Sequence, residues 1–180
     1  MRYLSLLLAS LLFLSACDSG YDAQGTGSSA SGLSTKVYRI RPGDTSRIQF
    51  RMLDSINALR QAAGAQPVSL NAELTAAAAT HSRDMSVQNR PWHFGSDGSS
   101  PIDRVRRAGY PGELLGENIS ETYETELETL AAWMEQDGTR TVILDKDARD
   151  VGFSWFQEPN GKLWWTLILG GPATGGDAGM

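Results

Sequence analysis

Few side chains in this sequence could carry acid–base or metal chemistry. The 180 residues include two histidines, His81 and His93, and a single cysteine, Cys17. One cysteine excludes an internal disulfide framework and any zinc site built from several thiolates. No Gly-x-Ser-x-Gly nucleophile elbow occurs, and Ser82 directly follows His81, so these two side chains would not face each other on a helix. Imidazole and carboxylate groups are therefore the main candidates for chemistry.

Two long helices are predicted ahead of His93. Apolar residues recur at three- and four-residue intervals from about residue 44, which predicts a helix that runs to Ala63 and stops at Gly64. Asn71 is a good cap for a second helix that ends before residue 91. His81 lies on the apolar stripe of this second helix, so we interpret it as a core or cleft-edge histidine and only a minor candidate for proton transfer.

A third, short helix has clear boundary signals. Ser100 can cap it, Pro101 takes the first helical position, and Gly109 follows its end. Its three arginines, Arg104, Arg106 and Arg107, are expected on a solvated face near the helix C-terminus, where cations are favoured. Anion binding is the alternative interpretation of this basic cluster.

The sequence signals for the remaining elements are weak near the start of the predicted domain and strong near its end. Tyr38 and Ile40 suggest a short opening strand, and a fourth helix is predicted over residues 125–136 with Leu127 facing inward. After residue 150 two β-rich runs flank Asn160-Gly161, a strong hairpin signal. We expect the hairpin aromatics to form a core rather than a ligand platform; they are Trp155, Phe156, Trp164 and Trp165. Helices followed by a hairpin predict an α+β layer fold.

The first residues predict export and membrane attachment. Residues 1–16 have the features of a signal peptide, and their apolar run is about half the ~20 residues that a membrane-spanning helix needs. Leu14-Ser15-Ala16-Cys17 resembles the lipobox of bacterial lipoproteins, in which the cysteine is lipidated. An ordinary secretory signal with a chance cysteine is the alternative. We therefore expect a protein of the bacterial cell envelope, anchored in a membrane through Cys17 and periplasmic in a Gram-negative source.

Composition sets the remaining boundaries. Residues 17–35 are rich in Gly, Ser, Ala and Asp and predict a flexible linker, residues 36–171 the folded domain, and residues 172–180 a disordered tail. The formal net charge of −5 makes a nucleic-acid partner unexpected.

Six short motifs follow one another along the predicted domain. They are Asn57-x2-Arg60-x3-Gly64-x2-Pro67, Ala79-x-His81-Ser82-x-Asp84-Met85, His93-x3-Asp97-Gly98, Arg104-x4-Gly109-Tyr110, Gly116-Glu117-Asn118-Ile119 and Trp133. Together they resemble the bacterial branch of the CAP superfamily, also called the SCP or PR-1-like domain, over about residues 48–169. This resemblance implies an α-β-α sandwich with a central antiparallel sheet and a wide cleft. Family members often gather two histidines and two acidic residues in that cleft.

By this resemblance, two of these cleft positions correspond to residues of the same type in the sequence. His93 corresponds to the first histidine and Glu117 to the first acid. Thr139 stands where the second histidine is expected, and Gln136, next to Glu135, stands where the second acid is expected. The tetrad is thus half present, with His93 and Glu117 as its candidate functional pair. The cleft-lining candidates are His81, Glu135, Gln136 and Thr139.

The half-present tetrad lowers the expectation of metal binding and catalysis. Open zinc sites typically use three protein ligands, so we expect no cofactor, with His93 at most a weak zinc ligand. The leading hypothesis is a non-enzymatic module that binds a lipid, a cell-wall glycan or another envelope protein. One alternative is a hydrolase in which His93 acts as general base and Glu117 orients it. The other is a structural envelope protein with a relict cleft.

Overall fold

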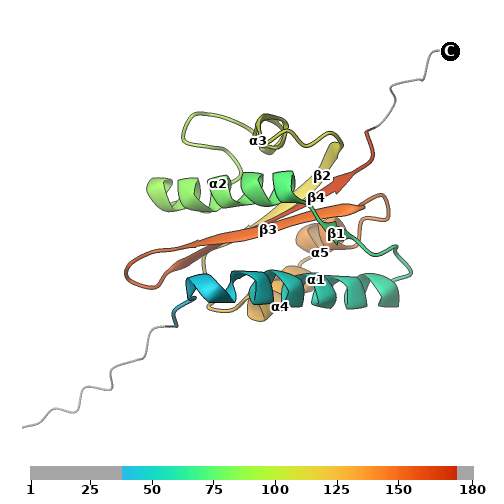
Figure 1. Cartoon of the computed structure of the whole chain (residues 1–180), viewed down its shortest axis with the longest axis horizontal. Coiled ribbons are helices and arrows are strands. Elements are labelled where there is room, and N and C mark those ends of the chain that lie inside the picture. The colour runs from blue at the N-terminus through green and yellow to red at the C-terminus, as the bar shows by residue number, and fades with distance from the viewer. Residues whose placement is uncertain (1–37, 174–180) are drawn as a thin grey trace, which may run out of the picture. The chain divides into compact units, whose positions relative to one another are not determined.

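The computed structural model describes residues 38–173 (Figure 1). The predicted signal peptide, the linker with Cys17 and the end of the predicted tail lie outside these residues. The elements in chain order are a 3-10 turn η1 (Pro42–Asp44), α1 (Thr45–Ala62), β1 (Ser69–Leu70), α2 (Ala72–Gln88), α3 (Pro101–Arg107), β2 (Glu113–Ser120), α4 (Glu126–Glu135), α5 (Asp137–Ile143), β3 (Asp150–Gln157) and β4 (Leu163–Gly171).

The four strands form one mixed sheet in the order β1-β3-β4-β2. β4 pairs antiparallel with both β3 and β2, and the short β1 adds a parallel pair between Ser69 and Asp150. The expected antiparallel sheet is confirmed for the three long strands. The predicted hairpin is confirmed as well: its turn is closed by a bond from the amide of Glu158 to the carbonyl of Lys162, and Gly161 takes the left-handed φ of 105° that this turn requires.

Helices cover both faces of the sheet, which confirms the expected α-β-α sandwich. In Figure 1, α2 and α3 lie on one face, and α1, α4 and α5 lie on the other. The alternation of side chains along β4 supplies both cores. Trp165 and Leu167 belong to the core under α1 and α4, whereas Ile168 belongs to the core under α2 and α3. Trp164 and Trp165 are fully buried, so these two aromatics pack in the interior as expected.

Local capping fixes where the helices that carry the site begin. The Asn71 side chain accepts a bond from the amide of Leu74 at 2.8 Å, which confirms the predicted cap of α2. Ser100 caps α3 in the same way, with Asp103 completing a capping box. Helix α2 lies directly on β3, since a Cβ added to Gly152 would collide with the backbone carbonyl of Leu74.

The structure differs from the sequence predictions in three places. Residues 38–40 form no strand; their backbone is held by the side chain of Gln157 instead. β2 and α5 were not predicted as separate elements. The inward orientation of Leu127 was wrong, because its side chain is 41% exposed while Thr129 and Leu130 face the core. In the part of the chain that the structure describes, no helix is long and apolar enough to cross a membrane.

Candidate functional site

The fold brings the two residues of the predicted functional pair into contact. Glu117 lies on β2 opposite Ile168, so its side chain points to the face of the sheet that α2 and α3 cover. Only 2% of this side chain is exposed. His93 lies in the connection between α2 and α3, and its Nδ1 is 2.9 Å from Oε1 of Glu117.

Arg104 is the third member of this cluster. Its Nη2 donates to both carboxylate oxygens of Glu117, at 3.0 and 2.8 Å, and its Nη1 donates to the carbonyl of Ser99. The side chain of Arg104 is 4% exposed, so its predicted place on a solvated face was wrong. α3 turns Arg104 and Val105 inward and leaves Arg106 and Arg107 outside. Charge pattern alone could not separate the three arginines, although only Arg104 belongs to one of the six motifs.

The contact with Glu117 sets the hydrogen positions on His93. A carboxylate oxygen can only accept, so Nδ1 of His93 carries the hydrogen of this bond. In the neutral ring, Nε2 is then left with its lone pair free. Half of the His93 side chain is exposed, which places it at the surface while its partner Glu117 is buried. The pair therefore presents one oriented imidazole to solvent.

Two aromatic residues flank His93, and the segment is fixed at several points. The indole Nε1 of Trp92 donates to the side chain of Gln88 at 2.6 Å, and the Gln88 amide donates to the carbonyl of Phe94. The rings of Trp92 and Phe94 lie 5.5 Å apart, and 48% of Phe94 is exposed. The guanidinium of Arg90 lies 3.8 Å from the centre of the Trp92 ring.

His81 binds the backbone of the segment that carries His93. It is fully buried on α2, with its Nε2 3.0 Å from the carbonyl of Trp92 and 3.7 Å from Oε1 of Glu117. Burial lowers the pKa of His81, and the opposing effect of Glu117 is smaller. The neutral ring therefore donates its Nε2 hydrogen to Trp92. Its Nδ1 has no partner among the described residues. His81 thus holds the segment that carries His93, as a buried cleft-edge histidine.

The other three candidate positions are not brought to this pair. Side chains of neighbouring residues on β2 point to opposite sides, and Asn118, next to Glu117, donates to the carbonyl of Thr139. The Thr139 hydroxyl donates to the carbonyl of Trp133, while Glu135 and Gln136 are exposed. Among residues 38–173, no hydrogen bond or ion pair joins any of these three side chains to His93 or Glu117.

The donor set does not fit a zinc ion. No three His, Cys, Asp or Glu side chains are grouped to hold a metal within the described residues. Both oxygens of Glu117 are already bonded to Arg104, and a guanidinium this close repels a cation. What remains is an imidazole whose Nε2 is not hydrogen-bonded within the described residues and can accept a hydrogen bond when the ring is neutral.

Comparison with known proteins identifies the family. The model of the CAP family, described as the cysteine-rich secretory protein family, matches residues 53–169, and the chain belongs to this family. The uncharacterized protein YkwD of Bacillus subtilis is 28% identical over 141 residues, which are 78% of this chain and 54% of that protein. The chain thus spans about half the length of this curated relative.

Solved structures confirm the fold. An outer surface protein from Borrelia burgdorferi matches with a TM-score of 0.66 and 14% identity, over 72% of this chain and 96% of that one. An extracellular protein with an SCP domain from Bacillus anthracis matches with a TM-score of 0.63 and 20% identity, over 73% of this chain and 44% of that one. At these identities the likeness establishes the CAP fold alone.

Proposed function

We propose that this protein is a binding module of the cell envelope, anchored through lipidated Cys17, that holds a cell-wall glycan on the surface around His93. The observation that carries the proposal is the 2.9 Å contact between His93 and Glu117, with Arg104 on the same carboxylate. It orients one imidazole toward solvent and supplies neither a side-chain nucleophile nor a metal site beside it. Such an arrangement is suited to recognition more than to turnover.

The neighbours of His93 favour a glycan over the other predicted ligand classes. A sugar hydroxyl can donate to the free Nε2 of His93. The apolar face of a sugar ring can pack on an exposed aromatic ring, and Phe94, the residue after His93, is 48% exposed. Because the segment is already fixed by Gln88, little conformational entropy is lost when a ligand binds.

The proposed location rests on two observations. Leu14-Ser15-Ala16-Cys17 has the form of a lipobox. Proteins of similar fold include an outer surface protein and an extracellular protein. A lipid anchor would hold the domain within reach of the cell wall on a linker of about 20 residues, 17–35.

Co-sedimentation with purified peptidoglycan tests the binding function. The full chain with Cys17→Ser, which removes the anchor, is expected to sediment with peptidoglycan, and His93→Ala is expected to weaken this binding at least tenfold. Phe94→Ala should weaken it as well. Phe50→Ala is the matched control, because this exposed phenylalanine lies on α1, away from the segment that carries His93. Absence of binding, or equal loss in the control, would overturn the proposal. Binding only to phospholipid vesicles would assign the lipid class instead.

A hydrolase is the second candidate, favoured by the hydrogen on Nδ1 of His93. With Glu117 accepting that hydrogen, Nε2 could take a proton from an attacking water. No hydroxyl or thiol is hydrogen-bonded to His93 within residues 38–173, so water would have to be the nucleophile. This function predicts release of soluble fragments from peptidoglycan that stops in His93→Ala. Continued release in that variant would exclude it.

A further inference from the structure

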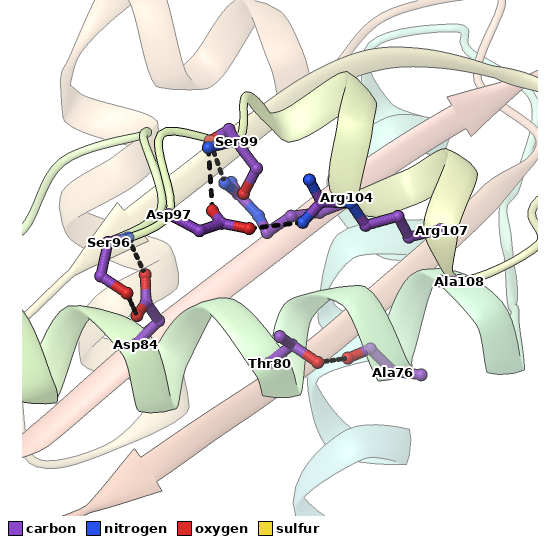
Figure 2. A pocket seen from close by; sticks show the side chains of 9 residues that line it. All are labelled: Ala76, Thr80, Asp84, Ser96, Asp97, Ser99, Arg104, Arg107 and Ala108. Carbon is purple, nitrogen blue, oxygen red and sulfur yellow. Dashed lines mark hydrogen bonds and ion pairs between the residues drawn. The ribbon is translucent and has the colours of Figure 1, made fainter.

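We propose that the cavity between α2 and α3 is a second binding site, which takes an amino sugar or a similar small molecule with hydroxyl and ammonium groups. This site is separate from the exposed imidazole of His93 and does not depend on the function proposed above. Figure 2 shows the cavity with its lining side chains, which come from α2, from α3 and from the segment between them.

The cavity has the size and form of a small-ligand site. Its volume is about 390 Å³, within the range of pockets that hold small molecules. Small side chains leave the space open: Ala76 and Thr80 on α2 and Ala108 at the end of α3. Polar side chains line the rest; they are Asp84, Ser96, Asp97, Ser99, Arg104 and Arg107.

The polar wall is held by hydrogen bonds among its own residues. Asp84 accepts bonds from the amide and the hydroxyl of Ser96, at 2.7 and 2.6 Å, which ties the segment to α2. Asp97 accepts from the amide of Ser99 at 2.9 Å and from Arg107 on α3 at 2.6 Å (Figure 2). Side chains held in this way do not need to be ordered when a ligand arrives, which favours affinity.

The charges in the cavity favour a cation. Asp97 is paired with Arg107, and Arg104 is neutralised by Glu117 outside the lining. Asp84 has no cationic partner among the described residues, so once these two ion pairs are formed its carboxylate is the uncompensated charge beside the cavity. Hydrogen bonds from Ser99 and then from Arg107 hold the pKa of Asp97 well below its usual range, so this carboxylate is ionised at neutral pH.

Arg104 leaves one buried donor beside the cavity without a partner among the described residues. Its side chain is 4% exposed and lines the cavity, yet its Nε has no acceptor among the described residues. Buried donors are rarely left unsatisfied in native proteins. This nitrogen is closed to solvent, so a molecule in the cavity reaches it only if the Arg104 side chain moves.

These properties define the ligand class. Carboxylates such as Asp84 only accept, guanidinium groups such as Arg107 only donate, and hydroxyl groups can bond to both. An ammonium group matches the excess negative charge, whereas a phosphate group opposes it. A hexosamine combines the hydroxyls and the ammonium group in a molecule small enough for the cavity.

NMR titration of the full chain with Cys17→Ser tests the site, with glucosamine as the probe. Saturable shifts are expected at the amides of Ala76, Thr80 and Ser96. Glucose should bind more weakly and glucose 6-phosphate should not bind. Ala76→Leu fills the floor from an exposed helix position and should weaken glucosamine binding at least tenfold. Ala79→Leu is the matched control, because it is exposed on the same helix but does not line this cavity.

The outcomes separate this site from the His93 surface. The proposal is overturned if glucosamine causes no saturable shifts, if Ala76→Leu binds like the control, or if glucose 6-phosphate binds more tightly than glucosamine. His93→Ala should leave glucosamine binding unchanged. Loss of glucosamine binding in His93→Ala would place the sugar on the other surface and would also overturn the proposal.

Discussion

Arg104 and Glu117 form a buried ion pair that joins α3 to the outer strand β2, with one guanidinium nitrogen bonded to both carboxylate oxygens. The two side chains are 4% and 2% exposed. In such surroundings either charge alone is costly, and the pair is stable because each residue compensates the other. The same pair holds the carboxylate on which the orientation of His93 depends.

Removal of one partner is therefore expected to destabilise the fold strongly. Arg104→Met should lower the free energy of unfolding by about 3–5 kcal/mol, because Glu117 would be left buried and uncompensated. Urea denaturation measures this change. Arg106→Met is the matched control, since Arg106 is exposed on the same helix, and it should change stability by less than about 0.5 kcal/mol. The double variant Arg104→Met, Glu117→Gln should recover part of the loss. Equal effects of the two single variants would contradict this account.

His81 predicts a dependence of stability on pH. Burial holds its folded-state pKa below the ordinary value near 6.5, so the unfolded chain binds the proton more readily. Stability should therefore be full above about pH 7 and should fall as the pH drops through 6.5, by at most about 1.4 kcal/mol per pH unit. Denaturation curves at pH 7.5, 6.5 and 5.5 measure this slope. In His81→Gln the slope should be smaller, and an unchanged slope would assign the pH dependence to other groups.

A substitution at Gly152 tests the close contact between α2 and β3. In Gly152→Ala the new methyl would collide with the backbone carbonyl of Leu74, so helix and strand would have to separate. We expect a loss of about 3 kcal/mol or more, or failure to fold, measured by thermal denaturation and by yield. Gly138→Ala is the control, because nothing lies within 4 Å of its Cβ position in α5. That variant should be neutral or slightly more stable. A mild effect at position 152 would show that α2 can move away.

Zinc titration by calorimetry tests the fit of a metal. Because Arg104 occupies the carboxylate of Glu117, the full chain should show no saturable heat at micromolar zinc. The variants His93→Ala and Glu117→Gln should look the same as the parent. Binding near 1 μM in the parent, lost in both variants, would mean about 8 kcal/mol from these residues and from a ligand not yet identified. That result would contradict the proposed role of Arg104.

The proposed lipid anchor at Cys17 predicts where the protein is found in the cell. Cys17→Ser should move most of the protein from the membrane to the soluble fraction, since each lipid methylene contributes about 0.8 kcal/mol of anchoring. Fractionation of cells followed by immunoblotting measures the distribution. Ser19→Ala changes a neighbouring polar residue and should stay with the membrane. Retention of the Cys17→Ser chain in the membrane would exclude the lipid anchor.

Helix boundaries and the hairpin could be predicted because their signals are local. Asn71 and Ser100 cap their helices through residues three positions on, and Asn160-Gly161 closes a turn by its own conformational preference. β2 lacks such a signal, because a glycine interrupts it and its partner β4 is far away in the sequence. Long-range pairing of this kind leaves little trace in a short stretch.

The site could be predicted only in part for the same reason. The pairing of His93 with Glu117 followed from the family motifs, yet the third member, Arg104, is defined by which side of α3 faces β2. The helix is seven residues long, and its three arginines all fit a solvated face. Whether the expected positions reach the His93–Glu117 pair depends on which face of the sheet carries them. Sequence position does not show this for Glu135, Gln136 and Thr139.

The two outer strands of the sheet make poor templates for aggregation. A strand edge with free backbone groups can recruit another chain unless it is short, irregular or covered. β1 offers only Ser69 and Leu70, too few residues to support an added strand. β2 has an irregular register between Leu114 and Gly116, and Val142 of α5 lies against this point. These features leave β1 and β2 without a long, regular edge on which the sheet of a second copy could pair.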